Sequence, residues 1–152
     1  MNAQKLIAGT IVGTLLFFLI NIIVNAFFLS DFLSTHQGLS TASFRSEELL
    51  PFSIASKLML SFLLTYLFLY AKVKTIIGGM ILSSIIAFFI KSSIYFQVYA
   101  TTTILSKSGL MAEVMCYTFI TAIVGGGIVM IADFAENAEV FIENDSTEIR
   151  LN

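Results

Sequence analysis

Four long apolar segments constrain this chain more than any other feature of its sequence. They cover residues 6–29, 52–71, 75–97 and 112–131. A helix needs about 20 mostly apolar residues to cross roughly 30 Å of hydrocarbon, and lipid offers no water to unpaired backbone groups. The alternating segments of about 10 residues that typify a membrane β-barrel are absent. The sequence therefore predicts an all-α fold, a four-helix transmembrane bundle that runs up and down, antiparallel, with both termini on the same side.

The composition also favours a membrane location. Hydrophobic residues make up 57% of the chain and charged residues only 12%, against roughly 25% charged residues in soluble domains. These proportions exclude a water-soluble enzyme, a disordered chain and a disulfide-stabilised secreted domain. Eight Lys and Arg against ten Asp and Glu leave no basic surface for nucleic acid. The partner that the composition predicts is the lipid bilayer.

The first apolar segment has a second interpretation, as a cleaved signal peptide. Lys5 would be its charged region and residues 24–26 its cleavage site. Its apolar run is about 24 residues long, however, whereas that of a signal peptide has roughly 7–15. Gly9 and Gly13 also have the spacing of helix-packing residues. We therefore favour a transmembrane helix.

Most of the chain forms one predicted domain. Residues 1–132 are expected to make a single four-helix transmembrane domain, with a polar loop over residues 31–50. The second connection, residues 72–74, is so short that the second and third helices are predicted to form a tight antiparallel hairpin. Residues 133–152 are an acidic C-terminal tail. A solvated, partly ordered tail is favoured, and a continuing helix or a small β-hairpin would also fit the pattern.

The basic residues indicate an orientation in the membrane. Lysine and arginine are divided almost evenly between the two sides of the predicted bundle. Short loops follow the positive-inside rule best, and the Lys-Val-Lys sequence of residues 72–74 is the shortest connection. The sequence therefore predicts a multi-pass protein of the cell membrane with both termini in the cytoplasm.

Glycines gather in the half of the predicted bundle that is nearer the termini. Seven of the nine lie there: Gly9, Gly13, Gly78, Gly79, Gly125, Gly126 and Gly127. Small residues let helices approach closely in lipid, so this end is predicted to be tightly packed. Glycine is also common in membrane helices in general, which is the plainer interpretation of the same pattern.

Polar residues gather in the other half, beneath the long loop. Asn21 and Asn25 share a face of the first helix, Tyr95 follows Lys91 by one turn in the third, and Glu113 opens the fourth. A charge at the centre of a membrane helix costs roughly 2.5–3.5 kcal/mol, so a partner is expected. We predict that Lys91 pairs with Glu113 and that these five residues line a polar cleft. Alternatively, both charges reach the membrane surface and the amides only join helices.

The sequence holds no recognisable catalytic or cofactor-binding motif. Cys116 is the only cysteine, which excludes a disulfide relay, and His36 is the only histidine. Nucleotide-binding, zinc-protease and serine-hydrolase motifs are missing. We therefore expect no catalytic residues, no cofactor and no metal site. Small four-helix exporters resemble one another in having an acid within the first helix, where this chain has Asn21 and Asn25. This difference counts against proton-coupled export of that kind.

The layout resembles a group of small, uncharacterised bacterial four-helix integral membrane proteins. The resemblance rests on KLIAGTIVGTLLFFL, on SDFLS at the start of the long loop, on KVKTIIGGMIL and on AIVGGGIVMI. It covers about residues 4–132 and consists mostly of glycines and hydrophobic spacing. It implies a fold and a place in the bacterial cytoplasmic membrane, and it implies no activity.

Three functions are compatible with these features. The favoured one is a non-enzymatic membrane protein that assembles with itself or with another membrane protein, through its glycine-rich faces or its long loop. The second is a small transporter or channel that uses the polar cleft. The third is a lipid-binding or lipid-modifying membrane protein, against which the missing catalytic residues count strongly.

Overall fold

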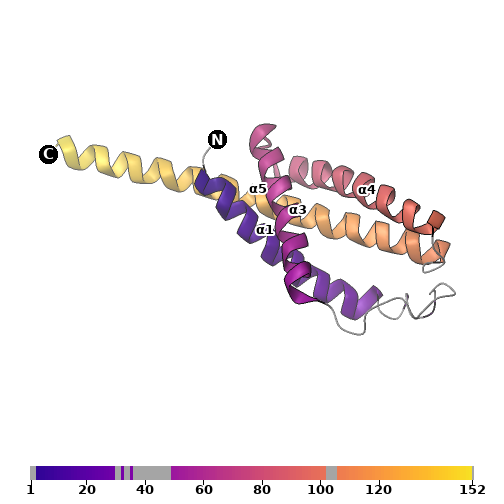
Figure 1. Cartoon of the computed structure of the whole chain (residues 1–152). Helices are drawn as coiled ribbons and strands as arrows, with labels where there is room; N and C mark the ends of the chain where they lie inside the picture. The colour runs from indigo at the N-terminus through magenta and orange to yellow at the C-terminus, as the bar shows by residue number, and fades with distance from the viewer. Residues whose placement is uncertain (1–2, 30–31, 33–34, 36–48, 102–105, 152) are drawn as a thin grey trace.

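The computed structural model describes four long helices. It describes the chain except residues 1–2, 30–31, 33–34, 36–48, 102–105 and 152. For residues 28–29 and 133–151 it describes the backbone alone. The elements are α1 (Ala3–Val24), a short π-helix η1 (Asn25–Leu29), α3 (Leu50–Tyr70), α4 (Ile76–Thr101) and α5 (Lys107–Leu151) (Figure 1). The prediction of an all-α fold with four helices is confirmed.

The described helices include four stretches that are long and apolar enough to cross a membrane, and the first of them runs from α1 into η1. These stretches are Ala3–Phe27, Leu50–Tyr70, Ile76–Thr101 and Lys107–Ala132. They match the four predicted segments, but the last begins about five residues earlier than expected. Ser106 explains this start, because its side-chain oxygen accepts a hydrogen bond from the Gly109 backbone N–H at 3.1 Å. That is the geometry of an N-cap, which satisfies a backbone donor at the helix start.

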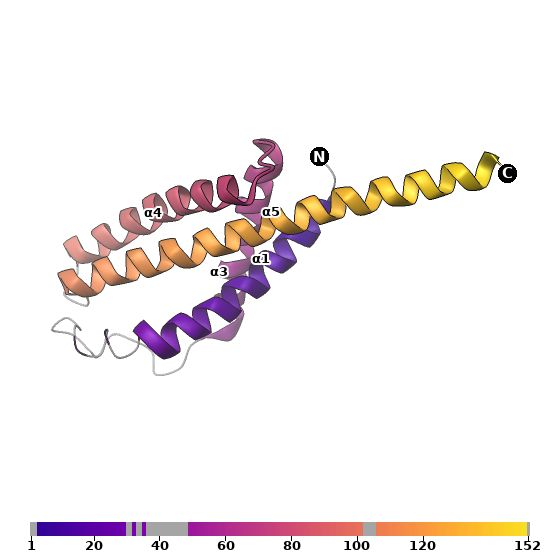
Figure 2. The same cartoon turned by 180° about the vertical axis from the view of Figure 1, so that it is seen from behind.

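The last helix continues well beyond its apolar part. The backbone of α5 remains helical to Leu151, so the acidic segment of residues 133–151 takes the helical alternative and not that of a β-hairpin. Figures 1 and 2 show this part projecting away from the other helices toward the C-terminus.

The helices pack in the order α4, α5, α1, α3. Helices α4 and α5 lie side by side along most of their length, and α1 packs against both α5 and α3 (Figures 1 and 2). Helix α3 crosses the others steeply and makes few contacts with α5. The prediction that α3 and α4 pack against each other as a hairpin is wrong. A short turn joins the two helices, but they do not pack along their length.

The turn between α3 and α4 shows how the chain separates these helices. The Val73 N–H reaches back to the Phe68 carbonyl at 3.0 Å, while Lys72 between them has a φ of 52°. This is the Schellman ending of a helix, in which one residue adopts the left-handed conformation. Thr75 then caps α4 by accepting a hydrogen bond from the Gly78 N–H at 3.1 Å. The turn thus directs α4 toward α5 and not back along α3.

The hydrophobic core lies in the half of the molecule that holds the glycines. Its buried members are Phe17, Leu64, Phe68, Ile120, Val124, Ile128 and Val129. The closest approach joins α4 to α5, where a Cβ atom added to Gly125 would lie 2.7 Å from the Gly79 carbonyl oxygen. No side chain fits between these two backbones, which is why both positions are glycine.

The other five predicted packing glycines differ in the residues that they contact. Gly9 lies against Thr65, Gly13 against Ile128 and Ser61, Gly126 against Met80 and Ile76, and Gly127 against Leu16. Gly78 differs, because the atoms nearest to it belong to Thr75 and Val73 of the preceding turn. Its assignment as a packing glycine between helices is therefore wrong, and its position belongs to the start of α4.

Candidate ligand-binding cavity

An open cavity of about 760 Å³ lies between α1, α3, α4 and α5. Its polar lining comes from every one of these helices: Asn21 and Asn25 from α1 and η1, Ser53, Ser56 and Lys57 from α3, Lys91 from α4 and Glu113 from α5. Leucine, isoleucine, methionine and aromatic side chains form the rest of its wall. The structure thus brings together Asn21, Asn25, Lys91 and Glu113, and Tyr95 lies beside them in contact with two of the four.

Lys91 lies between two aromatic rings. Its Nζ atom is 4.1 Å from the ring centroid of Tyr117 and 4.7 Å from that of Tyr95. A desolvated ammonium group over an aromatic face gains about 2 kcal/mol from the ring quadrupole. Tyr95 follows Lys91 by one turn of α4, and Tyr117 faces both from α5. The rings hold the ammonium group at the wall of the cavity without neutralising its charge.

Glu113 interacts with Tyr95 and not directly with Lys91. The Tyr95 hydroxyl donates a hydrogen bond to Glu113 Oε2 at 3.1 Å. Within the described part of the chain, Lys91 and Glu113 form no ion pair. The predicted pairing of these two charges is therefore wrong in its direct form. Tyr95 links them, with its ring beside the ammonium group and its hydroxyl on the carboxylate.

Lys57 adds a second positive charge to the cavity. Its Nζ donates a hydrogen bond to Ser53 Oγ at 2.6 Å and lies 4.7 Å from the centroid of the Phe18 ring. Ser53 precedes Lys57 by one turn, so the lysine extends toward the start of α3 while still lining the cavity. Lys57 and Ser53 are not among the residues that the sequence predicts for the cleft. Their four-residue spacing was the signal that would have paired them.

Asn25 marks a change of helix type at the end of α1. Its side-chain N–H donates to the Asn21 carbonyl oxygen at 2.9 Å, and the π-helix η1 begins at Asn25 itself. A side chain that occupies a carbonyl of the α-helical ladder loosens that ladder, and π-helical turns are often found at functional sites. Hydropathy could not reveal this turn, because the apolar character of the segment is the same in either type of helix.

The cavity ends on the hydrophobic core. Phe17 belongs both to the cavity wall and to the core, and its ring stacks on that of Tyr117 with centroids 6.2 Å apart. The glycine contacts lie on the side of this pair that is away from the cavity. Among the described residues, the core thus separates the cavity from the opposite end of the bundle.

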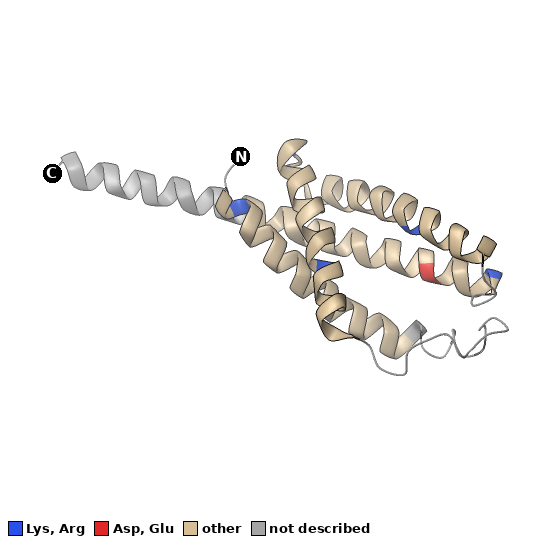
Figure 3. Cartoon of the chain, in the orientation of Figure 1, with Lys and Arg blue, Asp and Glu red and all other residues tan. Residues whose placement is uncertain are grey.

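The charges on the described lining residues of the cavity do not balance. Lys57 and Lys91 supply two ammonium groups, whereas Glu113 is the one acidic side chain that the structure describes anywhere in the chain (Figure 3). The described residues include no group of three or more metal-ligating side chains. His36 and Asp31 lie outside the described residues, so the expectation of no metal site stays a prediction. Cys116 is a free, half-buried thiol on α5.

An anionic group with an apolar attachment fits this arrangement of charge and surface. A carboxylate or phosphate could face the two lysines, while the apolar wall would contact a hydrocarbon chain.

Comparison of the chain with models of protein families, with curated proteins and with solved structures finds no match in any of the three.

Proposed function

We propose that this chain is a multi-pass membrane protein that binds an anionic amphiphile, such as a fatty acid or an anionic lipid, in the cavity between its four helices. The observation that carries the proposal is the excess of positive charge in an apolar setting. Two lysines line the cavity, and Glu113, the one carboxylate among its described lining residues, already accepts a hydrogen bond from Tyr95. Among the described residues, the Ser53 hydroxyl holds Lys57 and two aromatic rings hold Lys91, and none of these groups carries a negative charge. A bound anion would supply that charge and stabilise the protein.

The arrangement of α3 and α4 supports an amphiphile over a small soluble ion. These two helices line the cavity but do not pack against each other. In a bilayer, a hydrocarbon chain could therefore lie between them while its headgroup meets Lys57 and Lys91. The apolar part of the cavity wall, which includes Leu60, Leu63 and Ile94, matches such a chain.

The geometry supports this function better than assembly through glycine-rich faces and better than a channel. Assembly through glycine-rich faces loses its argument, because six of the seven glycines already contact other helices of the same chain. Most of the long loop lies outside the described residues and adds nothing for or against assembly. A channel needs a continuous polar path, whereas the cavity ends on the core at Phe17 and Tyr117.

Quenching of tyrosine fluorescence tests the proposal directly. The chain has five tyrosines and no tryptophan, so tyrosine emission is observable, and Tyr95 and Tyr117 lie at the cavity. Dibromostearate, whose bromine atoms quench nearby fluorophores, is titrated against the full chain in detergent. Its uncharged methyl ester serves as a matched probe for partitioning into the micelle. We expect saturable quenching by the acid and only a gradual, unsaturated decrease with the ester.

Lysine variants then identify the site. Lys57→Met and Lys91→Met keep apolar side chains of similar reach and remove the charge, and Lys107→Met removes a charge at the exposed start of α5. A hydrogen bond to a charged group contributes about 1.5–3 kcal/mol. The double variant should therefore bind dibromostearate at least tenfold more weakly, whereas Lys107→Met should bind as the parent does. Equal binding of acid and ester, or full binding by the double variant, would overturn the proposal.

A further inference from the structure

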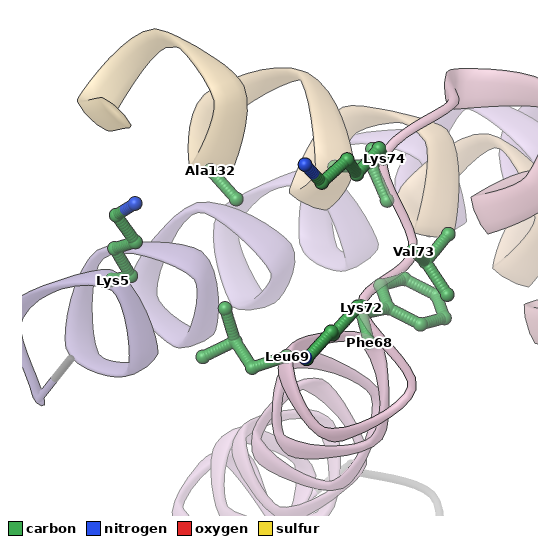
Figure 4. A pocket seen from close by; sticks show the side chains of 8 residues that line it. Lys5, Phe68, Leu69, Lys72, Val73, Lys74 and Ala132 are labelled. Carbon is green, nitrogen blue, oxygen red and sulfur yellow. The ribbon is translucent and has the colours of Figure 1, made fainter. Parts of the chain in front are cut away.

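A second, smaller pocket lies at the opposite end of the molecule from the cavity. Its volume is about 200 Å³. Three lysines contribute to it: Lys5 from the start of α1, and Lys72 and Lys74 from the turn between α3 and α4. Figure 4 shows them around one hollow, with Lys5 on one side and the two turn lysines on the other. The remaining lining residues are all apolar.

The pocket lies where all four apolar helical stretches reach the same end. The stretch of α1 begins at Ala3, that of α3 ends at Tyr70, that of α4 begins at Ile76 and that of α5 ends at Ala132. Lys5, Lys72 and Lys74 are within a few residues of these limits. In a bilayer this is the depth at which the hydrocarbon gives way to the phosphate groups of the lipids.

The lining itself has the two parts that a phospholipid requires. The lysine ammonium groups form the polar rim, and Phe68, Leu69 and Val73 form an apolar floor with Val129 and Ala132 (Figure 4). Lysine binds phosphate as a point charge, and basic pockets between membrane helices recognise anionic headgroups. A free phosphate would use only the rim, so the apolar floor favours a lipid.

Lys72 has a backbone conformation that most residues avoid. Its φ of 52° lies in the left-handed region, at the helix-ending position where glycine is most common. The chain nevertheless has a lysine there, with its side chain at the pocket. Asp133 follows Ala132 directly in the sequence, and its side chain lies outside the described residues.

We propose that Lys5, Lys72 and Lys74 form a binding site for the phosphate-bearing headgroup of an anionic phospholipid, with the start of its acyl chains on the apolar floor. The site is separate from the cavity between the helices and does not depend on the function proposed for it. It would anchor this end of the bundle in the membrane leaflet that is rich in anionic lipid.

Native mass spectrometry of the full chain in detergent tests this site. The chain is titrated with phosphatidylglycerol, with phosphatidylcholine of the same acyl chains, and with glycerol phosphate, which carries the phosphate without a lipid. We expect phosphatidylglycerol to bind about tenfold or more tightly than phosphatidylcholine, and glycerol phosphate to bind weakly or not at all. Equal affinity for the two lipids would overturn the proposal, and so would equal affinity for phosphatidylglycerol and glycerol phosphate.

Variants at the two ends separate this site from the cavity. Lys72→Gln with Lys74→Gln should abolish the preference for phosphatidylglycerol, whereas Lys72→Arg with Lys74→Arg should keep it and show that charge is what matters. Lys107→Gln controls for the loss of one positive charge elsewhere. Lys57→Met with Lys91→Met removes the cavity charges and should leave this preference in place. A preference that survives in the Lys72 and Lys74 glutamine variant would overturn the site, whatever the cavity binds.

Discussion

At the scale of single residues, Gly79 and Gly125 are the described glycines at which two helix backbones approach each other most closely. A Cβ atom on Gly79 would lie 2.9 Å from the Gly125 carbonyl oxygen, and one on Gly125 would lie 2.7 Å from the Gly79 carbonyl oxygen and still closer to Ser83. Backbone atoms on both helices would have to move to admit a methyl group. Gly126, one residue further along α5, meets the side chains of Met80 and Ile76 instead.

Gly125→Ala is therefore expected to destabilise the protein more than Gly126→Ala. Overpacking of this kind costs about 1–3 kcal/mol. At Gly126 the flexible Met80 side chain can move aside, and alanine gains up to about 1 kcal/mol in helix propensity over glycine. The check is the thermal unfolding midpoint of both variants in the same detergent. Equal midpoints would show that α4 and α5 do not approach as closely as the structure indicates.

Which residues meet could be predicted from the sequence better than how they meet. Spacing along the helices was enough to place Asn21, Asn25, Lys91 and Glu113 at one cavity, because each lies at a similar depth in its helix. Spacing could not show that the Tyr95 hydroxyl, and not the Lys91 ammonium group, would reach Glu113. That choice depends on side-chain rotamers and on the ring of Tyr117 from another helix.

At the scale of elements, hydropathy was sufficient to find the four helices but not to determine how they pair. A connection of three residues predicts a hairpin of α3 and α4, yet α4 packs on α5. Loop length limits only the distance between two helix ends. The crossing angle depends on the faces that fit together, and the glycines of α4 and α5 provide the closer fit.

The turn after α3 leads to a prediction about this element. Lys72→Gly should raise the free energy of unfolding by about 1 kcal/mol in detergent without anionic lipid, because glycine adopts a positive φ without the steric cost that lysine has. Lys74→Gly, two residues further on, serves as the control and should give no such gain. Unfolding by denaturant in the same detergent measures both. A loss of stability in Lys72→Gly would mean that the side chain contributes more to the turn than its backbone conformation costs.

At the scale of the whole molecule, the two ends of the bundle have opposite characters. One end is closed by the glycine contacts and the core, and the other contains the open cavity. Helix α3 passes through both regions. Ser56 lines the cavity, Ser61 is 0% exposed within the packed half, and Ala55 is exposed at the same depth as Ser56 without lining the cavity.

Three cysteine variants of α3 report on this difference, each made with Cys116→Ala so that no other thiol is present. A charged, water-soluble thiol reagent reacts with the thiolate, which forms only where water reaches the sulfur. In lipid vesicles, Ser56→Cys should react much faster than Ala55→Cys, which would face lipid, and Ser61→Cys should react only after unfolding. Dibromostearate should slow the reaction at Ser56→Cys alone, because it would occupy the same space. Similar rates at positions 55 and 56 would mean that the cavity is not hydrated in the membrane, and a bound anion would then have no polar route to Lys57 and Lys91.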